Sequence, residues 1–234
     1  MKKIIPFFIL VLALSACGTP SRTRSSLYPG MYEEKPVTLL VMPPINNTTN
    51  VEAKELLYTS ISRPLAEAGY YVIPPTLAME VLRQESAYDA ELFIDRPLKQ
   101  FHDFFGADAV VFSVIDTWSK YLNGIQTDIR YIIKSTLTDQ VLFDRTCNLY
   151  LDLSVHSSSD NDKKKDSSLL EVLVTAAIDV AAGALNTALT DQIEAARKAN
   201  YYIFQDLPVG KYDNLYLKDQ DYYAEPRNVT KTVK

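Results

Sequence analysis

Cys17 is the residue whose type and position are best suited to chemistry, because it directly follows an apolar segment near the start of the chain. Lys2 and Lys3 precede a stretch over residues 4–14 that is almost wholly apolar. A charged start, a short apolar stretch and small residues before the cysteine are typical of a secretory signal peptide. The stretch is shorter than the ~20 residues of a membrane-spanning helix. Because a cysteine thiolate is a nucleophile, Cys17 can form a covalent bond through its sulfur.

The apolar segment ends in four residues that resemble the bacterial lipobox, in which a leucine and two small residues precede a cysteine: Leu14, Ser15, Ala16 and Cys17. The resemblance implies that residues 1–16 are a cleaved signal peptide and that Cys17 becomes the lipidated N-terminus. Stable anchoring takes more than one acyl chain, so palmitate or a similar chain is expected beside the diacylglycerol. Gly18 is not aspartate, so the sorting rule of such lipoproteins implies the periplasmic face of the outer membrane, with surface exposure left open.

The composition of the 234 residues excludes several other kinds of chemistry. The net charge is −5, whereas a nucleic-acid-binding protein shows a basic face. Seven scattered glycines form no phosphate-binding loop. Two cysteines and two histidines do not suffice for a four-thiolate zinc site or a multi-histidine metal centre. We therefore expect no nucleic acid, no cofactor and no metal.

The residues that could act in catalysis are dispersed along the chain. His102 and His156 fall in different predicted elements, and the serines near His156 lack a Gly-x-Ser-x-Gly elbow. Cys147 lies on the apolar side of a predicted strand, where a thiol is inert. We predict no catalytic residues and a protein that is not an enzyme. An envelope hydrolase and a small-ligand carrier stay as alternatives, which require clustered groups with shifted pKa values or an enclosed apolar cavity.

The elements that position these residues begin with a strand, a helix and a second strand. Residues 37–42 form a continuous apolar run, typical of a strand buried on both faces, and residues 70–73 form the next. One helical face between them carries apolar residues about a turn apart: Leu57, Ile61, Leu65 and Ala68. This order predicts a parallel, right-handed βαβ unit.

A polar loop follows the first strand and is the first candidate for binding a partner: Asn46, Asn47, Thr48, Thr49 and Asn50. In open α/β sheets, ligands bind at the carboxyl ends of the strands. Asn and Thr also favour turns and helix caps, and Thr49 with Glu52 fits a capping box. Both roles, binding and capping, stay open.

The next part of the chain predicts two short helices and then three antiparallel strands. The helices cover residues 76–85, capped by Thr76, and residues 95–106. From residue 107 the apolar period is two, and Asn123-Gly124 favours a type I′ hairpin. The first strand of this meander ends at residue 118, and the second is a half-buried strand that extends to Leu137. The third strand has one apolar side, with these members: Val141, Phe143, Cys147, Leu149, Leu151 and Leu153. Arg145 interrupts that side.

A long helix over residues 168–200 completes the predicted fold, an α/β (α+β sandwich) fold with a mixed sheet. Residues 17–36 predict a flexible tether after the lipidated cysteine, and residues 37–200 the α/β domain. Residues 201–234 form a tyrosine-rich tail. Because tyrosine is enriched at interfaces, Tyr212 and Tyr216 are the second candidate surface for a partner.

Several stretches of the chain resemble one family of bacterial outer-membrane lipoproteins of unknown function, of the neisserial genome-derived antigen type: residues 39–50, 64–74, 88–91, 105–110 and 207–210. The resemblance covers most of the chain. It implies a fold like that of the TolB N-terminal domain and association with CsgG-like lipoproteins, and it offers no catalytic residues. The chain departs from the family at Ser158-Ser159-Asp160, where members are richer in glycine.

The resemblance and the residues together predict a lipid-anchored, non-enzymatic periplasmic protein. Its expected partners are the membrane, through the lipid on Cys17, and other envelope proteins such as CsgG-like lipoproteins, in envelope assembly, transport or secretion. Self-association is a further expectation. The alternative role is that of the LpoB lipoprotein, which has a related fold and activates a peptidoglycan synthase.

Overall fold

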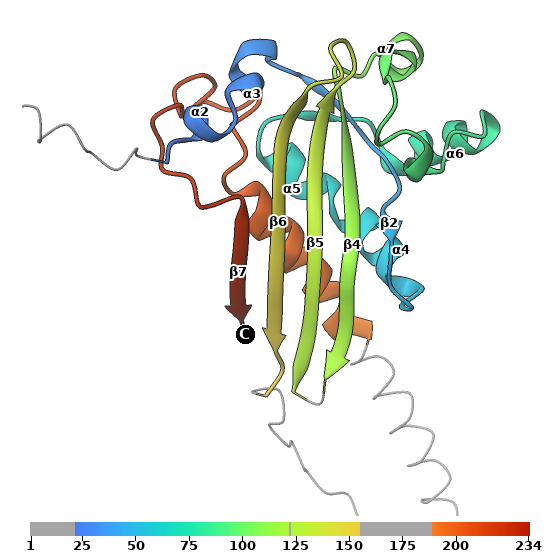
Figure 1. The fold of residues 1–234 in the computed structure, drawn as a ribbon, viewed down its shortest axis with the longest axis vertical. Coiled ribbons are helices and arrows are strands. Elements are labelled where there is room, and N and C mark those ends of the chain that lie inside the picture. The colour runs from blue at the N-terminus through green and yellow to red at the C-terminus, as the bar shows by residue number, and fades with distance from the viewer. Residues whose placement is uncertain (1–21, 122, 155–188) are drawn as a thin grey trace, which may run out of the picture.

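A computed structural model describes residues 22–121, 123–154 and 189–234 of the chain. Its centre is a mixed sheet with the strand order β3-β1-β4-β5-β6-β7, and β2 pairs with β4 beside that path (Figure 1). The strands are β1 (Thr38–Val41), β2 (Ile45–Asn46), β3 (Tyr71–Val72), β4 (Ala109–Tyr121), β5 (Gly124–Ser135), β6 (Val141–Asp152) and β7 (Asn228–Val233). The α-helices are α2 (Arg24–Leu27), α3 (Pro29–Glu34), α4 (Glu52–Ser60), α5 (Ser62–Glu67), α6 (Pro75–Gln84) and α7 (Lys99–Phe105), and residues 189–204 are also helical.

The predicted βαβ unit is confirmed. β1 pairs in parallel with β3 on one side and with β4 on the other. The two short helices α4 and α5 make the crossover, and the break between them lies just before Pro64, which is disfavoured within a helix. Gly69 follows α5 with φ +87°, a conformation that glycine adopts without strain.

The antiparallel meander β4-β5-β6 is also confirmed. The reason why position 124 requires a glycine differs from the predicted type I′ turn. The register pairs Tyr121 with Gly124, so residues 122 and 123 connect the strands. Gly124 is the first residue of β5, and a Cβ there would collide with the carbonyl oxygen of Leu151 and the ring of Tyr150. The close approach of β6, rather than a positive φ, requires the glycine.

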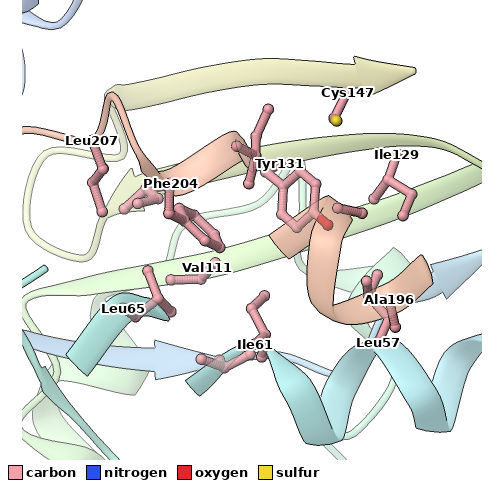
Figure 2. Packing of buried hydrophobic residues seen from close by; sticks show 14 of the residues in the cluster. Leu57, Ile61, Leu65, Val111, Ile129, Tyr131, Cys147, Ala196, Phe204 and Leu207 are labelled. Carbon is pink, nitrogen blue, oxygen red and sulfur yellow. The ribbon is translucent and has the colours of Figure 1, made fainter. Parts of the chain in front are cut away.

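Two apolar clusters lie on opposite faces of the sheet. Figure 2 shows the larger one, in which Leu57, Ile61 and Leu65 meet Val111 and Tyr131 of the strands. Helical residues 189–204 pack into the same cluster through these side chains: Ala195, Ala196, Ala199, Ile203 and Phe204. Cys147 is buried in this cluster, as predicted.

The smaller cluster lies under α6 and α7, on the other face. It buries Ile132 and most of Lys134, so this part of β5 is covered on both faces rather than half-buried as predicted. β5 ends at Ser135, and Leu137 is 62% exposed instead of lying in the strand. Val141 is exposed because the register shifts at the start of β6, which turns Leu142 inward instead.

The folded part of the chain begins earlier than the predicted boundary at Val37. α2 and α3 cover residues that the sequence assigned to a tether over 17–36. Tyr28 and Met31 are buried in the larger cluster, and the Tyr28 ring lies 4.6 Å from that of Phe143. This burial of apolar side chains explains why the segment joins the domain.

The predicted tail over residues 201–234 is likewise part of the domain. Its last segment forms β7, which pairs in parallel with β6 from Thr146 to Leu151. Arg145, which interrupts the apolar side of β6, holds this segment in place. Its buried guanidinium bonds to the carboxylate of Asp206 at 2.9 Å and to the carbonyl oxygens of Ile203 and Pro226.

We predict that Asp206→Ala lowers the free energy of unfolding by about 3 kcal/mol or more, because it leaves a buried guanidinium without its anion. Asp144→Ala is the matched control, since Asp144 pairs with Arg130 on the solvent-exposed side of the sheet; that loss should stay below about 1 kcal/mol. Urea unfolding of the purified variants measures both. Equal losses would contradict this account of Arg145.

Candidate functional site

The predicted lipidation site lies outside the described residues. Leu14, Ser15, Ala16 and Cys17 all precede Arg22, with which the description starts, and His156 falls in the gap after residue 154. The assignment of Cys17 therefore stays a prediction.

The predicted polar loop is closed on itself by hydrogen bonds. Asn46 ends β2, which pairs with β4 at Val114 and Ile115. Its Oδ1 accepts bonds from the backbone N–H and the hydroxyl of Thr48, at 3.1 and 2.8 Å. Its Nδ2 donates to the carbonyl oxygen of Asn50 at 2.8 Å. These bonds use the polar groups that a ligand would need.

Asn50, not Thr49, caps the helix that follows. Its Oδ1 accepts bonds from the backbone N–H groups of Glu52 and Ala53, both at 3.1 Å. Its Nδ2 donates to Gln192 Oε1 at 2.9 Å, which joins the loop to helical residues 189–204. The predicted capping box of Thr49 is therefore wrong, and Thr49 is exposed. Thr76 is not a cap either, because Pro75 already occupies the first turn of α6.

Asn47 lies beside a bulge in β4. Its Nδ2 donates to Asp116 Oδ1 at 2.8 Å. Asp116 is the extra residue where the β4–β5 register shifts. Burial, followed by the charge of Asp116, raises the pKa of Asp128 on the neighbouring strand. The loop is thus a structural junction with one exposed amide, Asn47.

The second predicted surface lies at the other end of α4 and α5. The backbone N–H of Tyr212 donates to the carbonyl oxygen of Gly69, two residues after α5, whereas Asn50 lies two residues before α4. Residues 52–67, which comprise the two helices and Ile61 between them, span up to about 24 Å at ~1.5 Å per residue. Tyr212 is 68% exposed and Tyr216 is half-buried. The two candidate surfaces therefore do not form one site.

An aromatic groove between α6 and α7 is a feature that the sequence reasoning missed. It measures about 290 Å³ and is lined by Val81, Leu82, Glu85, Ala87, Phe93, Gln100, Phe101, Phe104 and Phe105. Leu82 and Phe101 form its buried floor, whereas Phe104 is 60% exposed at its edge. The signal in the sequence was the pair Phe104-Phe105, since one face of a helix cannot bury two consecutive side chains.

A larger groove of about 500 Å³ lies between α4–α5 and helical residues 189–204. Its lining has five charged side chains, of which four form ion pairs, Arg63 with Glu67 at 2.8 Å and Lys198 with Glu194 at 3.5 Å, and the fifth is Arg197. This lining differs from the apolar cavity that a small-ligand carrier needs.

The two candidate catalytic groups within the described residues, His102 and Cys147, each have a role or a place in the folded core. His102 Nδ1 donates to the carbonyl oxygen of Ala107 at 3.1 Å, where it stabilises the end of α7. Burial raises the pKa of Cys147 to about 11.

Among residues 22–121, 123–154 and 189–234, no cluster of three or more His, Cys, Asp or Glu side chains is arranged to hold a metal ion. None of the helices described in this structure is both long and apolar enough to span a membrane.

A family model described as "Putative lipoprotein GNA1162-like" matches residues 27–207. The chain belongs to this family. A curated member from Neisseria meningitidis serogroup B, "Putative lipoprotein NMB1124/NMB1162", is 30% identical over 190 residues, which are 79% of this chain and 83% of the relative. Membership of the GNA1162-like family confirms the predicted resemblance and makes the chain a member of a lipoprotein family.

Solved structures similar to the chain include a GNA1162-like family member. The crystal structure of lipoprotein GNA1162 from Neisseria meningitidis is 24% identical, covers 63% of this chain and 97% of its own, and has a TM-score of 0.45. The PelC dodecamer from Paraburkholderia phytofirmans is 11% identical, with coverages of 76% and 91% and a TM-score of 0.39. The LpoB C-terminal domain from Escherichia coli is 14% identical, with coverages of 53% and 94% and a TM-score of 0.34.

We predict that Asn50→Ala lowers the free energy of unfolding by about 1–2 kcal/mol, because it removes the α4 cap and the bond to Gln192. Thr49→Ala, the neighbouring control, should change it by less than about 0.5 kcal/mol. Urea unfolding distinguishes the two residues. A larger effect at Thr49 would restore the capping box and contradict the described cap.

We also predict that Cys147 does not react with thiol reagents in the native protein at about pH 8, because a buried thiol with a raised pKa stays protonated. The Cys17→Ala form isolates this thiol, since the chain contains two cysteines. Alkylation followed by mass spectrometry should label it only after unfolding in urea. Rapid native labelling would show that the strand β6 opens.

Proposed function

We propose that the chain is an outer-membrane lipoprotein, held at the periplasmic face by acyl chains on Cys17, that binds other envelope proteins and catalyses no reaction. Membership of the GNA1162-like family supports the lipid anchor at the level of the family. The lipobox-like residues before Cys17 support its position.

The aromatic groove between α6 and α7 is the observation that carries partner binding. Its rings contact one another in a chain, Phe93 to Phe101 at 5.1 Å, Phe101 to Phe105 at 6.5 Å and Phe105 to Phe104 at 5.1 Å. Such contacts hold the rings in place before a partner arrives, which lowers the entropy cost of binding. Exposed aromatic residues at a groove are typical of the energetic centre of protein interfaces.

The surroundings of the groove favour a protein as its ligand. Its volume of about 290 Å³ lies at the lower limit of small-molecule pockets, ~300–1,000 Å³. Its edge is polar, with Glu85 and Gln100 in the lining and the ion pair of Lys99 and Asp103 on the same helix α7. An apolar centre with a polar rim is the ordinary anatomy of an interface. The expected ligand is therefore a helix or loop of an envelope protein that inserts apolar side chains.

The groups with raised pKa values do not favour an acid–base site. Burial raises the pKa of the Tyr58, Tyr70 and Tyr131 phenols, and each donates a hydrogen bond, to Pro75, Pro208 and Asn200 respectively. These phenols lie in the core and hold segments together. Burial in the core explains why the pKa values of these phenols are raised, so the raised values do not indicate a substrate site.

The role in envelope assembly, transport or secretion, with CsgG-like lipoproteins as partners, follows from the family resemblance and is part of the proposal. A peptidoglycan synthase as the partner, as for LpoB, is the alternative. Both roles use the same kind of surface, so the identity of the captured protein separates them.

The test is crosslinking in cells followed by purification of the lipoprotein from membranes. We predict that Phe104→Ser reduces the recovery of the partner by about tenfold or more, because an aromatic anchor at an interface contributes ~2 kcal/mol. Tyr121→Ser is the matched control, since Tyr121 is 52% exposed and lies at the far end of β4. Cys17→Ala should remove the protein from the membrane fraction.

Two outcomes would contradict the proposal. Unchanged recovery of partners with Phe104→Ser would exclude the α6–α7 groove as the docking surface. Continued membrane attachment of the Cys17→Ala form would exclude Cys17 as the anchor.

A further inference from the structure

The point where the chain enters the domain is fixed to the loop that precedes β7. The backbone N–H of Arg24 donates to Tyr222, that of Ala224 donates to Arg22, and both bonds measure 2.9 Å. Thr23 and Tyr223 form an antiparallel bridge between these two bonds. Figure 1 shows α2 beside this C-terminal loop, at the upper left of the domain. Arg22 thus has a defined place on the surface.

A buried ion pair stabilises this junction. Arg24 Nη1 lies 2.7 Å from Asp219 Oδ2, and the Asp219 side chain is fully buried. The same carboxylate accepts bonds from the hydroxyl of Tyr32 at 3.1 Å and from the backbone N–H of Val209 at 3.0 Å. Arg24 Nη2 donates to the carbonyl oxygen of Gln205. The junction therefore holds the loop before β7 and the start of the domain as one unit.

The distance from this junction to the proposed lipid is short. Five residue steps separate Cys17 from Arg22, so the two lie at most about 18 Å apart even when the chain between them is fully extended. A lipid on Cys17 lies at the membrane surface. The part of the domain that surrounds Arg22 must then face the bilayer closely.

The surface around the junction has the chemistry of a membrane interface. Within residues 211–223, four large side chains with aromatic or apolar groups are exposed: Tyr212, Leu215, Tyr222 and Tyr223. Tyrosine rings suit the headgroup layer, where the ring contacts apolar chains and the hydroxyl stays hydrated. The exposed charges beside them are mainly basic, with Arg22, Lys211 and Lys218 against Asp221, and an excess of basic groups attracts anionic headgroups.

We propose that this tyrosine surface, defined as Tyr212, Leu215, Tyr222 and Tyr223, rests in the headgroup layer of the membrane that holds the lipid. The inference rests on the proposed anchor at Cys17 and goes beyond it, because it fixes the orientation of the domain. The tip of the β4–β5 hairpin then points away from the bilayer. β6 alone separates Phe143, near the junction, from Asp152, near that tip, by about 30 Å.

The test uses the lipidated protein bound to vesicles of phosphatidylethanolamine and phosphatidylglycerol, with a fluorophore on one introduced cysteine. Tyr223→Cys places the label on the tyrosine surface, and Tyr121→Cys places it at the hairpin tip. Both tyrosines are exposed, at 66% and 52% respectively, so the two labels are matched. Lipids with a spin label on the headgroup quench fluorophores that reach the interface, and flotation of the vesicles reports attachment.

We expect the label at position 223 to be quenched severalfold more than the label at position 121, while both forms float with the vesicles. Adding Tyr212→Ser and Tyr222→Ser should remove most of this quenching without detaching the protein. If Tyr223→Cys reduces folding, as judged by circular dichroism, the label moves to Leu215→Cys with the same expectation.

Other outcomes separate this inference from the anchor. Flotation with equal quenching at both positions, or with stronger quenching at position 121, would overturn the orientation and leave the anchor intact. Failure of both forms to float would overturn the anchor, and the orientation with it.

Discussion

The guanidinium of Arg145 lies inside the protein, where an unpaired charge would cost several kcal/mol. Its partners, Asp206 and the carbonyl oxygens of Ile203 and Pro226, all come from the C-terminal part of the chain. The end of helical residues 189–204 and the start of β7 must therefore stay on β6. The larger apolar cluster depends on this, because Ile203 and Phe204 fill its centre.

A second buried charge, Asp219, connects the start of the domain to the same region. Both ion pairs thus hold the C-terminal part of the chain, whereas none of their residues lines the α6–α7 groove. In the proposed orientation the junction around Arg24 faces the membrane, and the α6–α7 groove lies on another side of the domain (Figure 1). A lipoprotein that binds partners needs this separation, since a surface that faces the bilayer cannot also receive another protein.

The sequence predicted the elements whose apolar residues follow a regular period. Leu57, Ile61 and Leu65 identified α4–α5, and the alternation from residue 109 identified the meander. It did not predict features that depend on distant partners. Arg145 was interpreted as an interruption of the apolar side of β6 because its partner Asp206 lies 61 positions later in the chain. The residues of α2 and α3 were interpreted as a tether because Tyr28 and Met31 are buried only by the assembled sheet. The roles of Asn50 and Gly124 likewise depend on neighbours, Gln192 and Leu151, that no local pattern reveals.

The contact between Arg24 and Asp219 spans 195 positions, so it has consequences for the order of folding. A domain that crosses a membrane from its N-terminus exposes Arg24 long before Asp219 follows. Until then residues 22–25 have no partner strand and stay accessible. Enzymes that modify Cys17 would meet an open segment rather than a cysteine five steps from a folded surface. Late closure of this contact would reconcile the proposed short link to a lipid on Cys17 with access for the enzymes that attach it.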